Sequence, residues 1–397
     1  MKKLFLAFAA AVSLNAQTLD SFVEQVLSKN PEIATLKAQA NAAKEEAKIA
    51  SSLDNPMLGV QVANIDFSSP AKRDIEPMQQ IMYSLTQNVP LNGKLSAREN
   101  AKKVYANSIE NRVEQKKLDI EFEVKKAAYE LTKAKETKKI YEKYLQTLRF
   151  ALDIARSSNI SGEISHSELI RAEMETASFL RKLNDLDSEI RISQKTIESF
   201  GTKPSEELLI KFDMPTSKAT NISLDLSKNI SMIEHEQKSI QNELRAEKLS
   251  IVPDVGVTVG YASSDTKFRD YWFFGLTIPL PIYGKENASV RKKTYELSAK
   301  QDEKTEMKNK LELELESNKI KLQSAQKNYE LTNKILKTQL SHLLESALAS
   351  SKSSAQARPY LISTIKDALG LELELINYKF DANVALAQIK KISGQEI

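Results

Sequence analysis

The residues of this chain that are able to do chemistry are few and scattered. The three histidines, His166, His235 and His342, lie far apart, and no metal-ligand spacing surrounds them. The chain has no cysteine, which excludes disulfides, thiolate zinc sites and cysteine nucleophiles. The acidic run at residues 312–316 alternates with leucines, which indicates a solvated helix surface beside a packing seam. We therefore predict that the protein is not an enzyme and binds no metal or cofactor.

The charge balance excludes further classes of partner. The chain has 57 Lys and Arg against 53 Asp and Glu, so it is close to neutral. A neutral chain does not favour nucleic acid or anionic lipid as a partner. No glycine-rich phosphate loop and no histidine-based triad occurs in the sequence. We expect no nucleic acid partner.

Residues 1–16 have the pattern of a secretory signal peptide. Lys2 and Lys3 precede an apolar stretch at residues 4–12, and residues 14–16 form a small-residue cleavage context. No later stretch reaches the length of apolar sequence that a transmembrane helix needs. The alternative is a buried first helix of a cytosolic protein. We expect the mature chain to leave the cytoplasm without a helical anchor.

Two segments of the sequence recur in the second half of the chain. Residues 56–62 (PMLGVQV) recur as residues 253–259 (PDVGVTV). Residues 85–94, which end in a Gly-Lys turn, recur as residues 276–285 with the same ending. A repeat of this length indicates two copies of one structural unit.

Each copy is predicted to contain a short helix, a β-hairpin, a long helix and a return helix. In the first copy, residues 17–201, the last three elements are expected at about 56–90, 94–160 and 163–200. A linker follows at residues 202–217. In the second copy, residues 218–397, the same elements are expected at about 253–282, 285–350 and 358–392.

The hairpins show the alternation of apolar with polar or small residues that is typical of strands. Val60 and Val62 share one face of the first strand, and Trp272 and Phe274 share one face of the last. After Ala63 the alternation changes phase, so a bulge or the end of the strand is expected there.

The remaining sequence is predicted to be helical. Residues 94–160 contain no internal Gly or Pro, and at about 1.5 Å per residue such a helix reaches roughly 100 Å. Apolar residues recur every seven positions, which favours left-handed coiling of helix on helix. These residues are Val113, Ile120, Ala127, Ala134, Tyr141, Leu148 and Ala155 in the first copy, and Leu315, Leu322, Tyr329, Leu336 and Leu343 in the second.

The apolar faces of the hairpins need an apolar cover. The chain turns from strand to helix at Pro90, Gly93, Pro281 and Gly284, because Pro ends strand pairing and Gly permits unusual backbone angles. The helices then lead away from the strands. Strands of about ten residues cross an outer membrane when tilted, but only in a closed barrel. Four strands do not close a lumen, so we expect a barrel shared between subunits. The alternative is that the strands pack on their own helices.

Aromatic residues crowd the end of the second hairpin. Tyr261, Tyr271, Trp272 and Phe274 are predicted to form an interfacial girdle near the cell exterior. Ordinary cross-strand aromatic packing is the alternative interpretation.

The chain resembles the TolC-like outer-membrane efflux proteins. The resemblance rests on the opening helix at residues 18–20 with Asn30-Pro31, on Asn55-Pro56 before the first strand, on the two Gly-Lys turns and on the repeat. It implies a mainly α-helical fold with a membrane β-barrel, in which a homotrimer forms a twelve-stranded barrel in outer-membrane lipid and a helical tunnel in the periplasm. It also implies a passive exit duct that docks on a periplasmic adaptor and an inner-membrane efflux pump. The turns look most like the heavy-metal branch, which implies metal cations as substrates.

The resemblance also assigns a gate and contact positions. Asp367 matches a position that faces the periplasmic entrance in this family, so three copies would form a carboxylate ring, and Gly370 replaces a second acid and implies a weaker ring. A solvated surface acid beside Lys366 is the alternative. The positions implied for adaptor contact, at two helix-turn-helix tips, are Gly162, Ser165, Glu168, Ser363 and Thr364. The second copy has Leu361 where the tip signature has Gly.

Two other functions compete with an export duct. A periplasmic coiled-coil adaptor would need one helical hairpin flanked by compact β domains, whereas this sequence has two hairpins and a duplicated strand pair. A secreted enzyme with helical decoration is disfavoured because the sequence shows no catalytic constellation.

Overall fold

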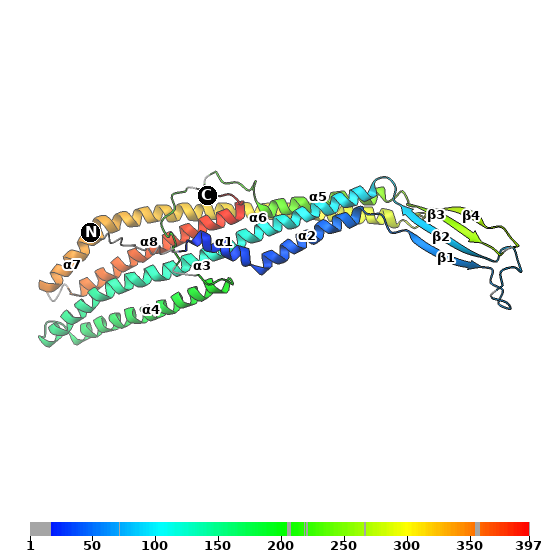
Figure 1. Cartoon of the computed structure of the whole chain (residues 1–397). Helices are drawn as coiled ribbons and strands as arrows, with labels where there is room; N and C mark the ends of the chain where they lie inside the picture. The colour runs from blue at the N-terminus through cyan, green and yellow to red at the C-terminus, as the bar shows by residue number, and fades with distance from the viewer. Residues whose placement is uncertain are drawn as a thin grey trace, which may run out of the picture. The chain divides into compact units, whose positions relative to one another are not determined.

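The computed structural model describes residues 17–70, 72–204, 208–217, 219, 221–265, 267–353 and 358–396, so the predicted signal peptide lies outside the described residues. The chain divides into two compact units (Figure 1). The first unit comprises Met1–Ala34, Glu114–Ser227 and Lys310–Ile397, and the second comprises Thr35–Val113 and Lys228–Asn309. Within the described ranges, no helix has the length and apolar character needed to cross a membrane.

The described chain is mainly helical, with one antiparallel sheet. The helices are α1 (Leu19–Lys29), α2 (Pro31–Ser51), α3 (Lys94–Ile160), α4 (His166–Ser199), α5 (Lys228–Leu249), α6 (Lys285–Ile335), a π-helical turn (Leu336–Leu340), α7 (Ser341–Ser353) and α8 (Arg358–Ser393). The strands are β1 (Met57–Ala63), β2 (Gln80–Val89), β3 (Val255–Ser263) and β4 (Tyr271–Thr277).

The opening helix is broken where the sequence places a proline. Thr18 caps α1 by accepting a hydrogen bond from the Ser21 backbone N–H, and the helix ends at Lys29. Pro31 keeps the preceding Asn30 extended, with φ −69° and ψ 122°. The Asn30 side chain then accepts hydrogen bonds from the backbone N–H groups of Glu32, at 2.9 Å, and Ile33, at 3.2 Å. Asn30 thus ends one helix and caps the next.

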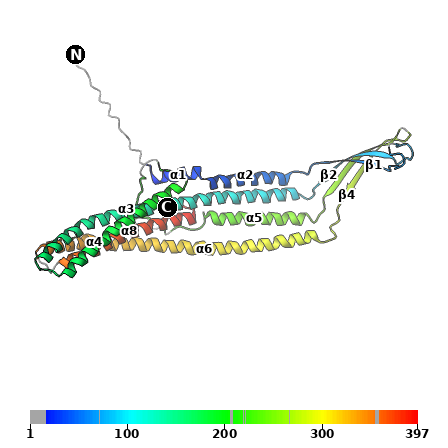
Figure 2. The same cartoon turned by 90° about the horizontal axis from the view of Figure 1, so that it is seen from below.

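In the second unit, four helical segments lead into the sheet. Figures 1 and 2 show α2, the first part of α3, α5 and the first part of α6 running side by side toward the strands. Lys102 of α3 pairs with Glu46 of α2 at 2.8 Å, and Lys293 of α6 pairs with Glu243 of α5 at 2.6 Å. The buried Ser239 hydroxyl of α5 donates to the Ala101 carbonyl of α3. Polar contacts therefore tie each helical segment to its neighbour.

The sheet has the order β1-β2-β3-β4, and each neighbouring pair is antiparallel. The two hairpins thus join through β2 and β3, and β1 and β4 form the edges. Strand β1 ends at Ala63, and Asn64 after it has a φ of 51°. This confirms that the change of alternation after Ala63 marks the end of a strand.

The seven-residue repeat of α3 forms a packing seam. All but one of its predicted seam residues are buried, and the partly buried Tyr141 packs against the core of Leu148, Phe179 and Ile365. The seven-residue pattern of the first copy therefore marks core positions, and the predicted left-handed coiling stays a prediction.

The corresponding seam of the second copy is interrupted. Leu315 and Leu322 are buried, but Leu343 is 39% exposed, and Leu340 and Ala347 are buried instead. The cause is the π-helical turn at Leu336–Leu340, because its wider turn rotates the following helix relative to the heptad pattern. The single helix expected at 285–350 is therefore divided into α6, the π turn and α7.

A network of partly buried charges joins α1, α3 and α8. One carboxylate oxygen of Glu121 accepts hydrogen bonds from Lys125, at 2.8 Å, and Lys390, at 2.7 Å. Lys125 also lies 3.3 Å from Asp20 of α1, and Lys390 lies 2.8 Å from Glu396. Burial alone would raise the pKa of Glu121, but the hydrogen bonds and charges of Lys125 and Lys390 outweigh burial and hold this pKa below its ordinary value.

We predict that Glu121→Gln lowers the free energy of unfolding by about 1.5–3 kcal/mol at neutral pH, because the substitution leaves two lysines without their shared carboxylate. Since the pKa of Glu121 is lowered by folding, its contribution is present above the ordinary glutamate pKa and is lost as the pH falls through the lowered value. The difference between wild type and variant should therefore shrink in acid. Denaturant unfolding at several pH values measures this.

The matched control is Glu123→Gln, which changes an exposed glutamate two residues away. Equal losses in the two variants, or a difference that persists in strong acid, would contradict the assigned role of Glu121.

Candidate functional site

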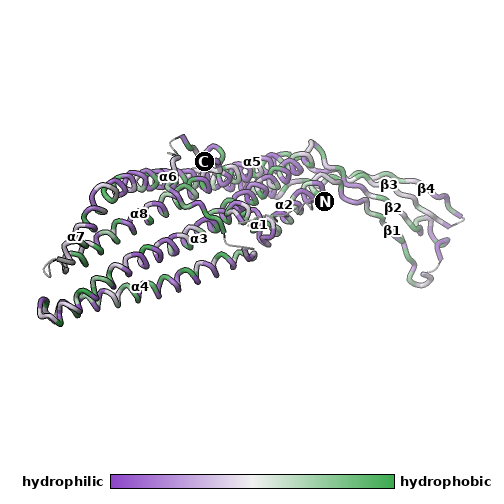
Figure 3. Tube along the Cα trace, turned by 60° about the vertical axis from the view of Figure 1, so that its left-hand side comes forward, coloured by the Kyte–Doolittle hydropathy of each residue, from purple (hydrophilic) through white to green (hydrophobic). Residues whose placement is uncertain are grey.

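One face of the sheet is apolar and exposed. The strand register aligns Leu58, Leu85, Val259 and Phe274 across all four strands, and each of these side chains is exposed. The row next to it contains Val60, Tyr83, Tyr261 and Trp272. Because residues in register share a face, these rows form a continuous apolar surface. Figure 3 shows hydrophobic and hydrophilic positions alternating along the strands.

The opposite face of the sheet is small and polar. The Thr86 and Thr258 hydroxyls lie 2.9 Å apart across β2 and β3. Across the described strands no residue carries a charge, so this face is neutral. The residues of this face are Met57, Gly59, Gln61, Ala63, Gln80, Met82, Ser84, Thr86, Asn88, Gly256, Thr258, Gly260, Ala262, Tyr271, Phe273, Gly275 and Thr277.

An aromatic ring approaches one glycine of this polar face so closely that a side chain there would collide with it. Gly260 is buried and lies opposite Phe273, and a Cβ atom at position 260 would lie 2.1 Å from the Phe273 ring. At Gly275, on the neighbouring strand, an added Cβ would meet Thr258 at an ordinary 3.6 Å. The outer end of the Phe273 ring therefore occupies the space that a side chain at position 260 would need, so this position favours glycine.

The predicted aromatic girdle is divided between the two faces. Tyr261 and Trp272 pair on the apolar face with ring centroids 5.3 Å apart, and Phe274 lies exposed on the same face. Tyr271 pairs with Ala262 and lies on the polar face, where its hydroxyl accepts a hydrogen bond from the Gln80 side chain at 2.8 Å. The alternation of β4 places Tyr271 on the opposite face from Trp272 and Phe274, so we leave it out of the girdle.

The strand-to-helix turns have the same backbone geometry in both copies. Gly93 and Gly284 both have a φ of 71°, in the left-handed region that glycine adopts without strain. Each glycine is followed directly by the first residue of a long helix. Pro90 and Pro281 lie just before these turns, outside the described strands.

The turn between α3 and α4 is built from local hydrogen bonds. Gly162 has a φ of 78°, and the Ser158 carbonyl accepts a hydrogen bond from the Glu163 N–H at 2.8 Å. Ser165 and Glu168 form a capping box, in which each side chain accepts from the backbone N–H of the other. Three predicted contact residues thus have a local structural role, and the exposed Gly162 and Ser165 remain accessible.

The second tip differs from the first. The connection at residues 354–357 lies outside the described residues. Leu361, which stands where the tip signature has Gly, is a helical residue of α8 and is 1% exposed in the same core as Leu148. Thr364 is also 1% exposed, and its hydroxyl donates to the Tyr360 carbonyl. Because Thr364 packs inside the bundle, we leave it out of the contact surface, whereas Ser363 is exposed.

Asp367 lies at a groove between α3, α4 and α8. This groove, of about 540 Å³, has an apolar floor that includes Ala155 and Ile362 and a rim that includes Arg171 and Asp367. Next to Asp367, Lys366 forms an ion pair with Glu175 of α4 at 3.2 Å. Asp367 is exposed, and Gly370, one helical turn later, is exposed too. Both predicted gate positions are therefore accessible on α8.

A polar link between α3 and α8 has no signal in the sequence. One carboxylate oxygen of Glu372 accepts hydrogen bonds from the Tyr144 hydroxyl, at 2.8 Å, and from Lys143, at 2.7 Å. Burial raises the pKa of the Tyr144 hydroxyl, and the hydrogen bond to Glu372 raises it further. Because these residues are far apart in the chain, only the folded structure brings them together. This link holds α8 against α3 near the gate positions.

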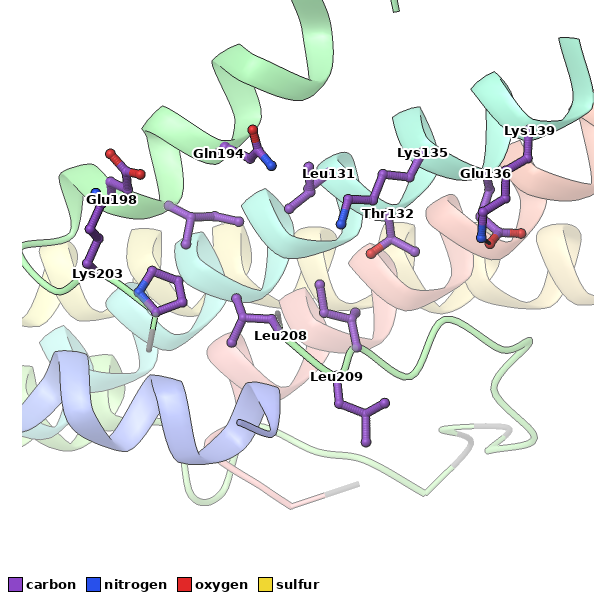
Figure 4. Close-up of a pocket in the computed structure, with 13 residues that line it drawn as sticks. Leu131, Thr132, Lys135, Glu136, Lys139, Gln194, Glu198, Lys203, Leu208 and Leu209 are labelled. Carbon is purple, nitrogen blue, oxygen red and sulfur yellow. Dashed lines mark ion pairs between the residues drawn. The ribbon is translucent and has the colours of Figure 1, made fainter. Parts of the chain in front are cut away.

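A second hollow lies between α3, α4, residues 203–204 and residues 208–210 (Figure 4). Its volume is about 950 Å³, and its lining mixes aliphatic side chains such as Leu131 and Leu208 with charged ones. Glu136 and Lys139 of its lining pair within α3 at 3.5 Å. The lining contains no histidine. We assign no chemistry to this hollow.

These features define a class of protein. A mainly helical chain whose strands expose an apolar face over four strands has the construction of a subunit of an outer-membrane channel. The family described as outer membrane efflux protein matches residues 22–200. The match covers the first of the two copies, so the chain is similar to this family over that part.

Solved channel structures share the fold over nearly the whole chain. The outer-membrane protein VceC of Vibrio cholerae is 14% identical with a TM-score of 0.78, and the match covers 95% of this chain and 96% of that one. The CmeC outer-membrane channel of Campylobacter jejuni is 15% identical, with a TM-score of 0.74 and coverage of 95% and 85%. The open-state MtrE channel of Neisseria gonorrhoeae is 14% identical, with a TM-score of 0.75 and coverage of 95% and 88%. No curated protein sequence matches the chain.

We predict that Gly260→Ala destabilises the folded protein by about 1–3 kcal/mol, because the added methyl group must displace the Phe273 ring. The double variant Gly260→Ala/Phe273→Leu should recover part of this loss, and Gly275→Ala should have a much smaller effect. Thermal unfolding of the detergent-extracted protein measures all three. Equal losses at positions 260 and 275 would contradict the assigned contact.

Proposed function

We propose that this chain is the outer-membrane exit duct of a tripartite efflux system. Three copies form a twelve-stranded barrel in the outer membrane, and their helices form a tunnel in the periplasm. A periplasmic adaptor docks on the tunnel and connects it to an inner-membrane efflux pump, which supplies the energy. The duct itself is passive. The match of residues 22–200 to the outer membrane efflux protein family and the fold shared with solved channel structures support this proposal.

The apolar face of the sheet is the observation that carries the proposal. Its two rows of apolar side chains, which cross all four strands, require an apolar medium, and lipid accepts strands only when a barrel closes. The edge strands β1 and β4 run in opposite directions, so β4 of one copy pairs antiparallel with β1 of the next. Three such sheets supply enough strands to enclose a lumen.

The polar face of the sheet then becomes the wall of the lumen. Since the described strands carry no charge, this wall favours neither cations nor anions. Charge selection would therefore depend on the helical entrance. There we assign Asp367, with Gly370 in place of a second acid, to a ring of three carboxylates. The exposed residues Gly162, Ser165 and Ser363 are the accessible positions that we assign to adaptor contact.

The substrate class is proposed only from the subfamily resemblance of the two Gly-Lys turns, which favours metal cations. A deletion strain separates the classes of substrate. Increased sensitivity to copper, zinc or cobalt supports metal export. Sensitivity confined to detergents, bile salts and dyes contradicts metal export but does not contradict the proposal of an exit duct.

We predict that Leu85→Arg blocks insertion into the outer membrane, whereas Thr86→Arg is tolerated. The two residues are neighbours on β2 but lie on opposite faces, and an arginine facing lipid near the bilayer centre costs about 2–4 kcal/mol. Fractionation followed by size measurement of the detergent extract gives the readout. Wild type and Thr86→Arg should appear as outer-membrane trimers, and a soluble periplasmic monomer of wild type would overturn the proposal.

We also predict that Asp367→Asn lowers the preference of the duct for cations. Removing three carboxylates from one ring removes the negative field that attracts cations there. The shift of reversal potential across a planar bilayer under a KCl gradient measures the preference. Asp153→Asn, at an exposed aspartate of α3, is the control. An unchanged reversal potential in Asp367→Asn would refute the gate assignment.

A further inference from the structure

The two strand-to-helix turns have similar sequences, and each ends in a lysine. Among the described residues, only the lysine of the first turn has an ion-pair partner. Lys94, the first residue of α3, is 2% exposed. Its ammonium lies 2.5 Å from a carboxylate oxygen of Asp254 and donates to the Val252 carbonyl at 3.0 Å. Asp254 directly precedes β3. A lysine at the end of β2 thus fastens the start of the neighbouring strand.

Lys285 occupies the same place in the second copy. It is the first residue of α6, and it follows Gly284, whose φ of 71° equals that of Gly93. Unlike Lys94, Lys285 is exposed, and it forms no ion pair with any described residue. A lysine at a helix N-terminus lies at the positive end of the helix dipole, so it is stabilised by a nearby anion. The adjacent Glu286 does not supply it, because successive helical residues do not face each other.

The order of the strands indicates where this anion comes from. Lys94 follows β2 and reaches the start of β3, the strand that pairs with β2. By the same rule Lys285, which follows β4, reaches the start of the strand that pairs with β4 on its other side. Strand β4 is an edge in the single chain, and in the repeat β1 corresponds to β3. The strand that continues the sheet beside β4 is therefore β1 of a second copy.

The segment that leads into β1 contains one carboxylate. Residues 52–56 are Ser-Leu-Asp-Asn-Pro, and their only acid is Asp54. Asp54 is exposed, and its backbone carbonyl accepts a hydrogen bond from the Gln87 side chain, which fixes the segment beside β2. Its carboxylate forms no ion pair with any described residue. One exposed cation and one exposed anion thus lie at opposite edges of the same sheet.

We propose that Lys285 of one chain pairs with Asp54 of the next and fastens the join between subunits. The inference rests on the proposed trimer, and it names the residues that hold β4 of one copy against β1 of another. The occupant of the edge is a second copy of this chain. Each join resembles the Lys94 contact, except that Asp54 lies three residues before Met57, which is the position that the repeat aligns with Asp254.

Crosslinking tests this contact directly because the chain has no cysteine of its own. The variant Asp54→Cys/Lys285→Cys is extracted in detergent, its mass is measured by light scattering, and it is treated with a short bismaleimide. Covalent dimers and trimers on a denaturing gel are expected. The matched variant Lys94→Cys/Asp254→Cys should crosslink within one chain and remain at monomer mass.

The possible outcomes separate this contact from the proposed function. Trimers that give no intermolecular crosslink would overturn the Lys285–Asp54 contact and leave the duct intact. A wild-type protein that is monomeric by light scattering would overturn the duct and this contact with it.

Charge reversal provides a second measurement that does not depend on cysteine chemistry. Lys285→Glu and Asp54→Lys should each lower the temperature at which trimers dissociate, because each places like charges at the join. The double variant Lys285→Glu/Asp54→Lys should recover most of the loss. Additive losses in the double variant would contradict the pairing.

Discussion

The uncovered apolar face of the four-stranded sheet is the constraint on which the rest of the structure depends. The rows that contain Leu85 and Val60 extend across all four strands, and their side chains are mostly exposed. At about 25 cal/mol per Å² of apolar surface, such a face is not stable in water on a soluble monomer. The neutral polar face has the opposite requirement, since its threonine and glutamine side chains need water or each other. A closed barrel satisfies both faces.

The two copies of the internal repeat share some features and differ in others. The turns at Gly93 and Gly284 have the same φ, and each starts a long helix. The copies differ where they meet different neighbours. Lys94 is buried against the second copy, whereas Lys285 is exposed at the edge of the sheet. The π turn at Leu336–Leu340 also has no counterpart in α3, which is continuous from Lys94 to Ile160. Lys94 thus makes its contact within its own chain, whereas Lys285 at the edge of the sheet has no ion pair with a described residue.

The sequence predicted features that depend on local or periodic patterns. The alternation in the hairpins predicted the two faces of the sheet and the end of β1 at Ala63, and the heptads of α3 predicted buried positions such as Ala127 and Leu148. The capping box of Ser165 and Glu168 has a recognisable spacing, but the family resemblance directed attention to adaptor contact instead. Knowing that Thr364 follows the buried Leu361 by three helical positions would have indicated that it is buried.

Features that depend on distant residues or on a change of helix phase were not predictable. The link between Tyr144 and Glu372 joins α3 to α8, and the Glu121 network joins three helices. Both require the folded packing. The π turn changes the phase of the second seam without a Gly or Pro to mark it, so Leu343 looked like a seam residue. Composition groups Tyr271 with Trp272 and Phe274, although strand alternation places it on the other face.

The most direct measurement of the central claim is the accessibility of single spin labels along β2 in reconstituted bilayers, which the absence of native cysteine makes simple. Labels at positions 81, 83 and 85 should be relaxed by oxygen dissolved in lipid, and labels at 82, 84 and 86 by a water-soluble nickel complex. Nickel access at all six positions, or no alternation between the two reagents, would show that lipid does not cover the apolar face.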